Sequence, residues 1–127
     1  MAHFLVENGA DVNIQDNKGQ SPLYCAVHRR DENIARLLVE NGADVNIQDN
    51  RGQSPLYCAV DRREESIARF LLKNGANVSA RNNEGRTPRD LAEEQKDENM
   101  VDILQYWNAD INGLQYFTRF LIRVFTE

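Results

Sequence analysis

The feature that most constrains this chain is a repeat of 33 residues. Residues 6–38 and 39–71 are identical at all but five of their 33 positions. The five differences are Lys18/Arg51, His28/Asp61, Asp31/Glu64, Asn33/Ser66 and Leu37/Phe70. A third copy, residues 72–104, is more divergent but keeps the register without any insertion or deletion. A period held this strictly predicts a solenoid, in which each unit packs on its neighbours.

Each unit carries the start and stop signals of two short helices. In the first unit, Ser21 and Pro22 form an N-cap followed by proline at the first helical position, so we expect an inner helix from Pro22 to about Arg29. Asp31 marks the start of a second helix with a one-sided apolar stripe. Asn41-Gly42 ends that helix with a residue able to take positive φ. A polar loop then leads to the next unit.

This order of elements resembles the ankyrin repeat family. Two segments and their copies carry the resemblance: Gly19-Gln20-Ser21-Pro22-Leu23-Tyr24 and Leu37-Leu38-Val39-Glu40-Asn41-Gly42-Ala43-Asp44-Val45-Asn46. The resemblance implies an all-α fold, an ankyrin-type helix–turn–helix solenoid with β-hairpin loops. We expect the array over residues 1–112 to comprise a partial unit 1–5, full repeats 6–38, 39–71 and 72–104, and a partial unit 105–112.

Two sets of residues depart from the family pattern. Tyr24 and Tyr57 stand where the family often has histidine, so the usual histidine hydrogen bonds between repeats are absent or replaced. Arg30, Arg63 and Lys96 replace the glycine common in the turn between the helices. If these residues take positive φ, each turn carries strain on the order of 1 kcal/mol.

The third unit carries signals that the array ends there. Arg89-Asp90-Leu91-Ala92 resembles the form often seen near the end of an array, and Thr87 with Asp90 fits a capping box. Residues 113–127 then place apolar side chains at helical spacing. We expect this segment to be a helix that caps the last repeat. A helix that binds a partner or another copy of the chain, and the start of another domain, are the alternatives.

The composition disfavours catalysis, cofactors and metals. No phosphate-binding loop, His-Glu-x-x-His helix or nucleophile motif is present, and we expect no bound metal or cofactor. Cys25 and Cys58 are one repeat apart. Helices pack about 8–10 Å apart, beyond the ~7 Å Cα limit for a disulfide, so we expect reduced core thiols. We therefore predict a protein that is not an enzyme.

Charge and hydropathy limit the classes of partner that the protein can bind and the cellular compartments in which we expect it. The net charge of −5 and pI near 5.1 disfavour non-specific binding to nucleic acid. No stretch approaches the ~20 apolar residues of a membrane span. The N-terminus lacks the features of a signal peptide. We expect a cytoplasmic or nuclear monomer that binds neither nucleic acid nor membrane, with self-association through the C-terminal helix as an alternative.

The resemblance implies protein–protein recognition on the concave face, formed by the loop tips and the exposed side of the inner helices. The positions it assigns to partner binding are Gln15, Asn17, Lys18, Gln20, His28, Arg29, Gln48, Asn50, Arg51, Gln53, Asp61, Arg62, Arg81, Asn83, Glu84, Arg86, Glu94 and Gln95. Six basic residues form a row across the first two units: Lys18, Arg29, Arg30, Arg51, Arg62 and Arg63. We expect this row to be a solvated face that nearby carboxylates partly neutralise, with a groove for an acidic or phosphorylated segment as the functional alternative.

Two further functions remain open at this point. In one, the chain is an adaptor or effector whose C-terminal helix recruits a second partner, such as a ubiquitin-ligase component. In the other, it is a structural or artificial repeat fragment without a partner of its own, since near-identical units fit either recent duplication or deliberate repetition.

Overall fold

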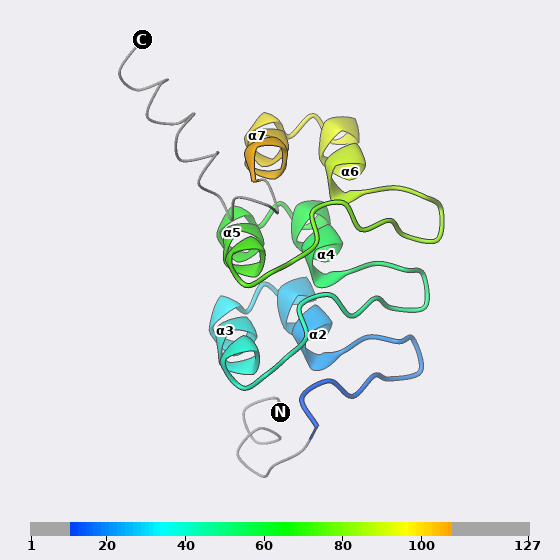
Figure 1. Cartoon of the computed structure of the whole chain (residues 1–127), viewed down its shortest axis with the longest axis vertical. Coiled ribbons are helices and arrows are strands. Elements are labelled where there is room, and N and C mark those ends of the chain that lie inside the picture. Colours follow the sequence, from blue (N-terminus) through cyan, green and yellow to red (C-terminus); the bar gives the residue numbers. More distant parts are fainter. Residues whose placement is uncertain (1–10, 108–127) are drawn as a thin grey trace.

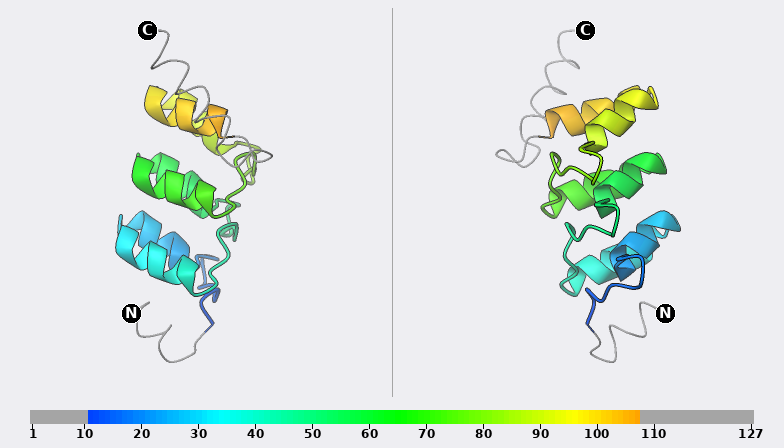
Figure 2. Two further views of the ribbon diagram at one scale, coloured as in Figure 1. Left: turned by 60° about the vertical axis from the view of Figure 1, so that its left-hand side comes forward. Right: turned by 90° about the vertical axis from the view of Figure 1, so that its right-hand side faces the viewer.

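A computed structural model describes residues 11–107 as three stacked units, each a loop followed by two antiparallel helices (Figure 1). The inner helices are α2 (Pro22–His28), α4 (Pro55–Asp61) and α6 (Pro88–Glu94). The outer helices are α3 (Glu32–Glu40), α5 (Glu65–Lys73) and α7 (Glu98–Tyr106). Inner helices lie between the loops and the outer helices, and the three tiers stack in the same orientation (Figure 2). This arrangement confirms the predicted all-α helix–turn–helix solenoid.

Each inner helix begins at the serine or threonine that the sequence indicates. The hydroxyls of Ser21 and Ser54 accept the backbone N–H groups three residues later, both at 3.2 Å. Thr87 forms the full capping box with Asp90, in which each side chain bonds the other residue's backbone N–H. These bonds satisfy donors that the first turn of a helix leaves unpaired.

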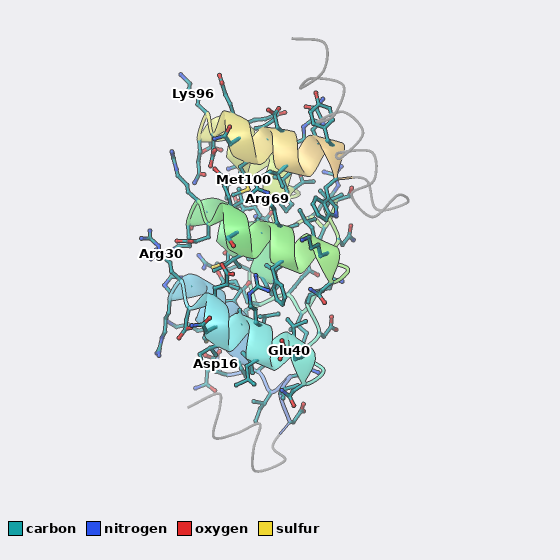
Figure 3. All side chains as sticks on the ribbon, turned by 90° about the vertical axis from the view of Figure 1, so that its left-hand side faces the viewer. Asp16, Arg30, Glu40, Arg69, Lys96 and Met100 are labelled. Carbon is teal, nitrogen blue, oxygen red and sulfur yellow. The ribbon has the colours of Figure 1, made fainter. Side chains whose placement is uncertain are left out.

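The turn between the two helices of each unit requires a left-handed residue. Arg30, Arg63 and Lys96 occupy it with φ values of 61°, 58° and 57°. Figure 3 shows Arg30 and Lys96 on the same side of the stack, at the ends of their inner helices. The strain expected from the absence of glycine is therefore present in all three turns.

The outer helices end as predicted in the first two units and differently in the third. Gly42 and Gly75 follow the helix ends at φ 94°. The C-cap residues of α3 and α5 are Asn41 and Asn74, with ψ values of 21° and 20°. In the third unit Trp107 is the C-cap, with φ −84° and ψ 89°, and its side chain is buried.

The core runs through the stack between successive helix pairs. Leu23, Leu38, Leu56, Leu71 and Ile103 are each no more than 1% exposed. Helices of seven or nine residues are too short to be stable in isolation, so burial between tiers supplies most of their stability.

The loops turn back on themselves but contain no β-strand within residues 11–107. Backbone hydrogen bonds such as Asp16 N–H to the Gln20 carbonyl, at 3.1 Å, hold them instead. The predicted partial unit at residues 1–5, most of the one at 105–112 and the predicted helix at 113–127 lie outside the described residues.

Candidate functional site

Each loop is shaped by a side chain that bonds back to its own backbone. Asp16 Oδ1 accepts the N–H groups of Lys18 and Gln20, both at 2.9 Å. Asp49 and Asn82 make the equivalent bonds in the second and third loops. The residues that these turns place at the exposed loop tips are Lys18, Arg51 and Glu84.

Neighbouring loop tips are joined by two hydrogen bonds. The N–H of Asn50 donates to the carbonyl of Lys18 at 3.0 Å, and its Nδ2 donates to the carbonyl of Asn17 at 2.9 Å. Asn83 makes the equivalent pair of bonds to the second loop, at 2.9 and 2.8 Å. Glycine is required at Gly19 because φ is 76° and a Cβ there would lie 2.5 Å from Asn50 Oδ1.

Glutamine side chains add a second row of bonds between the loops. Gln15 Nε2 donates to the carbonyls of Gly19 in its own loop, at 2.8 Å, and of Gln48 in the next, at 3.2 Å. Gln48 repeats both bonds one unit later, at 2.8 and 2.9 Å. Arg81, the equivalent residue in the third loop, donates to the carbonyl of Gly85 at 2.8 Å.

A third row of bonds was missed by the sequence analysis. Asn13 Oδ1 accepts the N–H of Asp44 at 2.8 Å, and its Nδ2 donates to the carbonyl of Gly42 at 3.4 Å. Asn46 makes the equivalent bonds at 2.8 and 3.0 Å. The available signal was asparagine repeated at the 33-residue period within a polar loop.

Tyr24, which stands where the resemblance leads us to expect a histidine, makes one hydrogen bond between repeats. The hydroxyl of Tyr24 donates to Gln53 Oε1 of the next unit at 3.2 Å. Burial raises the pKa of this hydroxyl well above its usual range. Gln53 is therefore held by the preceding repeat as well as by its own loop.

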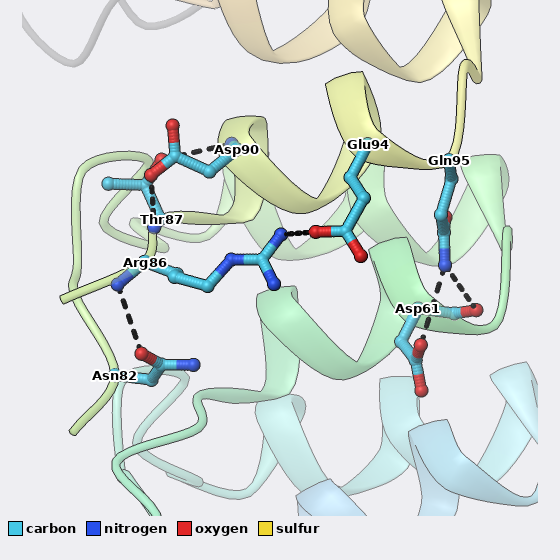
Figure 4. A network of polar contacts seen from close by, with 7 residues as sticks. All are labelled: Asp61, Asn82, Arg86, Thr87, Asp90, Glu94 and Gln95. Carbon is cyan, nitrogen blue, oxygen red and sulfur yellow. Dashed lines mark hydrogen bonds and ion pairs between the residues drawn. The ribbon is translucent and has the colours of Figure 1, made fainter. Parts of the chain in front are cut away.

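Around the third unit, several predicted binding residues already make polar contacts within the chain (Figure 4). Arg86 and Glu94 form an ion pair along α6. Gln95 Nε2 lies 3.4 Å from both the backbone carbonyl and Oδ1 of Asp61. Within the described residues, Arg62 Nε and Gln95 Oε1 are buried without a hydrogen-bond partner.

The predicted row of six basic residues is partly neutralised. Arg30 Nε lies 3.2 Å from Glu64 Oε1 of the next unit. Arg63 Nη2 donates to the carbonyl of Gln95 at 3.3 Å. Lys18, Arg29 and Arg51 have no hydrogen bond or ion pair from their side chains to the described residues. Three cations of the row, Lys18, Arg29 and Arg51, are therefore exposed and unpaired among the described residues.

The structure divides the predicted binding residues into two groups. Those whose side chains bond within the chain are Gln15, Gln48, Asn50, Gln53, Asp61, Arg81, Asn83, Arg86, Glu94 and Gln95. Those whose side chains bond to nothing in residues 11–107 are Asn17, Lys18, Gln20, His28, Arg29, Arg51, Arg62 and Glu84. Apart from the buried Nε of Arg62, the second group retains its side-chain donors and acceptors for a partner.

The two cysteines are free thiols with no sign of activation. Cys58 is buried against Tyr24, and burial raises its pKa to about 12. Cys25 is partly exposed, and desolvation raises its pKa as well. A nucleophilic cysteine needs a lowered pKa, so both thiols fit a packing role.

Metal-binding clusters and membrane-spanning helices are absent from the described part of the chain. Among residues 11–107, no three His, Cys, Asp or Glu side chains are grouped to hold a metal ion. The helices in the same range are all too short and too polar to cross a membrane.

Comparison with known proteins is consistent with this architecture. A family model of ankyrin repeats, in three copies, matches residues 1–82 and 47–114. A search of curated protein sequences gave no match.

Proposed function

The chain belongs to the ankyrin repeat family, and we propose that it binds a protein segment on its concave face without catalysing a reaction. Ankyrin repeats are generally protein–protein interaction modules. The face in question comprises the loop tips and the exposed side of α2, α4 and α6. The observation that carries the proposal is a set of exposed side chains without partners on a frame joined by hydrogen bonds.

The rigidity of that frame supports recognition. The loops are joined by three rows of amide bonds, through Asn50 and Asn83, Gln15 and Gln48, and Asn13 and Asn46. A surface that is already ordered loses less conformational entropy on binding, so more of the contact energy appears as affinity.

The partner that we propose is an acidic or phosphorylated segment. Lys18, Arg29 and Arg51 are exposed and have no anionic partner among the described residues. Arginine pairs with carboxylate and phosphate oxygens through two parallel hydrogen bonds, which gives direction as well as attraction. Association should therefore slow as salt rises, because exposed charges more than about 10 Å apart are largely screened from each other at 0.1 M salt.

Capture of partners by charge-reversed variants tests this function. The full chain is immobilised as the parent, as Arg51→Glu and as Lys73→Glu. Lys73 is an exposed cation at the end of α5, away from the loop tips, so it controls for net charge. We expect a protein captured by the parent to be lost from Arg51→Glu and retained by Lys73→Glu. Equal capture by all three chains would contradict the proposal.

A second comparison separates this function from the adaptor alternative. Deleting residues 113–127 should leave capture on the concave face intact, provided that circular dichroism shows the shortened array to be folded. Loss of all partners in a folded, shortened chain would instead favour an adaptor whose C-terminal segment does the recruiting.

A further inference from the structure

We propose that the three loop tips select an extended partner segment by its order of charges, with acidic groups opposite Lys18 and Arg51 and a basic group opposite Glu84. The inference rests on the proposed function and names the kind of segment that the concave face takes. The partner is thereby an acidic–acidic–basic segment rather than a uniformly acidic one.

The sign change along the tips is the first observation. Positions 18, 51 and 84 are equivalent in the repeat and carry Lys, Arg and Glu. All three are exposed, and none of these side chains bonds to another residue in the described range. Their charges are thus available to a partner.

Other charges near the tips are already engaged. Asp16 and Asp49 accept backbone N–H groups inside their own loops. Arg81 donates to the carbonyl of Gly85, and Arg86 pairs with Glu94. A segment lying across the tips therefore meets Lys18, Arg51 and Glu84 as the charged side chains whose hydrogen-bonding groups are unoccupied.

The spacing between successive loop tips is fixed, so the tips can distinguish partner segments by the order of their charges. Two hydrogen bonds through Asn50 and two through Asn83 hold each loop to the one before it. A repeat advances by about one helix-packing distance, roughly 8–10 Å. A polyproline II segment has three residues per turn and rises about 3.1 Å per residue, so every third side chain points the same way at a spacing of about 9 Å. The matching pattern is acidic-x-x-acidic-x-x-basic.

Four synthetic peptides of fixed conformation test the charge order. Two have the predicted order, read in either chain direction: Glu-Pro-Pro-Glu-Pro-Pro-Lys and Lys-Pro-Pro-Glu-Pro-Pro-Glu. A third, Glu-Pro-Pro-Lys-Pro-Pro-Glu, has the same composition but places the cation in the middle. The fourth, Glu-Pro-Pro-Glu-Pro-Pro-Glu, is uniformly acidic. Binding of labelled peptides to the full chain is measured by fluorescence anisotropy at low salt and at 0.15 M salt.

We expect one of the two ordered peptides to bind the parent about two- to fivefold tighter than the middle-cation peptide, because an exposed ion pair contributes modestly. Glu84→Lys should move the preference to the uniformly acidic peptide. Arg51→Glu should abolish the preference, and Lys73→Glu should leave it unchanged. Circular dichroism confirms that each variant is folded.

Three outcomes would overturn the inference: equal binding of ordered and middle-cation peptides, an unchanged preference in Glu84→Lys, or no binding of any peptide. If partner capture still depends on Arg51 while the peptides show no order preference, the proposed function stands and the charge-order inference falls. If capture is insensitive to Arg51, the proposed function itself fails.

Discussion

Three residues in the turns between helices store backbone strain. Arg30, Arg63 and Lys96 lie in the left-handed region, where a Cβ is crowded by the carbonyl oxygen. Arg30 and Arg63 recover part of this cost through contacts with the next unit, to Glu64 and to the carbonyl of Gln95. Lys96 makes no such contact within residues 11–107.

Lys96→Gly should therefore stabilise the protein. Glycine takes φ 57° without the Cβ penalty, and its extra freedom in the unfolded chain offsets only part of the gain. We expect the free energy of unfolding in urea to rise by about 0.5–1 kcal/mol. Lys96→Ala is the matched control, since it removes the side chain but keeps the Cβ; an equal gain in that variant would contradict the strain argument.

The buried thiol of Cys58 should make the free energy of unfolding fall at alkaline pH. Its pKa is raised from 9.0 to about 12 in the folded protein, so the unfolded chain releases the proton first. Stability from this group is complete below pH 9.0 and declines toward pH 12, by at most about 1.4 kcal/mol per pH unit. We expect Cys58→Ala to flatten the decline between pH 9 and 11 in urea titrations, and Cys25→Ala to flatten it less. An unchanged slope in Cys58→Ala would show that the thiol is not the titrating group.

At the scale of elements, the outer helices begin in two different ways. Asp31 and Asp97 accept the N–H of the third residue that follows, at 3.1 and 3.2 Å. Glu64 makes no cap bond and instead pairs with Arg30 of the preceding unit. The longer side chain of Glu64 thus forms an ion pair with the preceding repeat in place of a cap bond to its own helix.

Removing these caps should have unequal costs. We expect Asp97→Ala to lower the free energy of unfolding by about 1 kcal/mol, because a donor in the first turn of α7 loses its acceptor. Glu64→Ala should cost only a few tenths of that, since it removes a partly exposed ion pair. Chemical denaturation of both variants measures the difference, and equal losses would mean that the cap assignment at α7 is wrong.

At the scale of the whole molecule, cohesion between repeats comes from the packed helices and from the amide bonds along the loops. Asn50 joins the first and second loops through its backbone and its side chain. In a solenoid each unit contacts only its neighbours, so weakening one interface loosens the unit beyond it rather than the whole array.

Asn50→Ala should therefore lower the local stability of the first unit more than that of the others. Loss of the bond to the Asn17 carbonyl costs about 1 kcal/mol. Hydrogen exchange should rise in α2 and α3 more than in α6 and α7. Asn33→Ala, on the exposed face of α3, is the control and should leave exchange unchanged. A uniform rise across all six described helices in Asn50→Ala would mean that the array unfolds as a single unit.

The sequence by itself determined the repeat, the helix boundaries and the strained turns, because these depend on contacts between residues close in the chain. The hydroxyl of Ser21 accepts a backbone N–H three residues away, and Gly42 follows the end of α3 with the positive φ that glycine tolerates. Only the tertiary structure shows which of the predicted binding residues are free, because most of their bonds join residues 29 to 34 positions apart, as in Tyr24 with Gln53 and Asp61 with Gln95. Arg81 and Arg86 are the exceptions, since their partners Gly85 and Glu94 lie 4 and 8 positions away. The geometry of the bonds between repeats exists only once the units stack. The same stacking pairs Arg30 with Glu64 and leaves the side chains of Lys18, Arg51 and Glu84 unpaired. Residue type and spacing alone do not predict this difference.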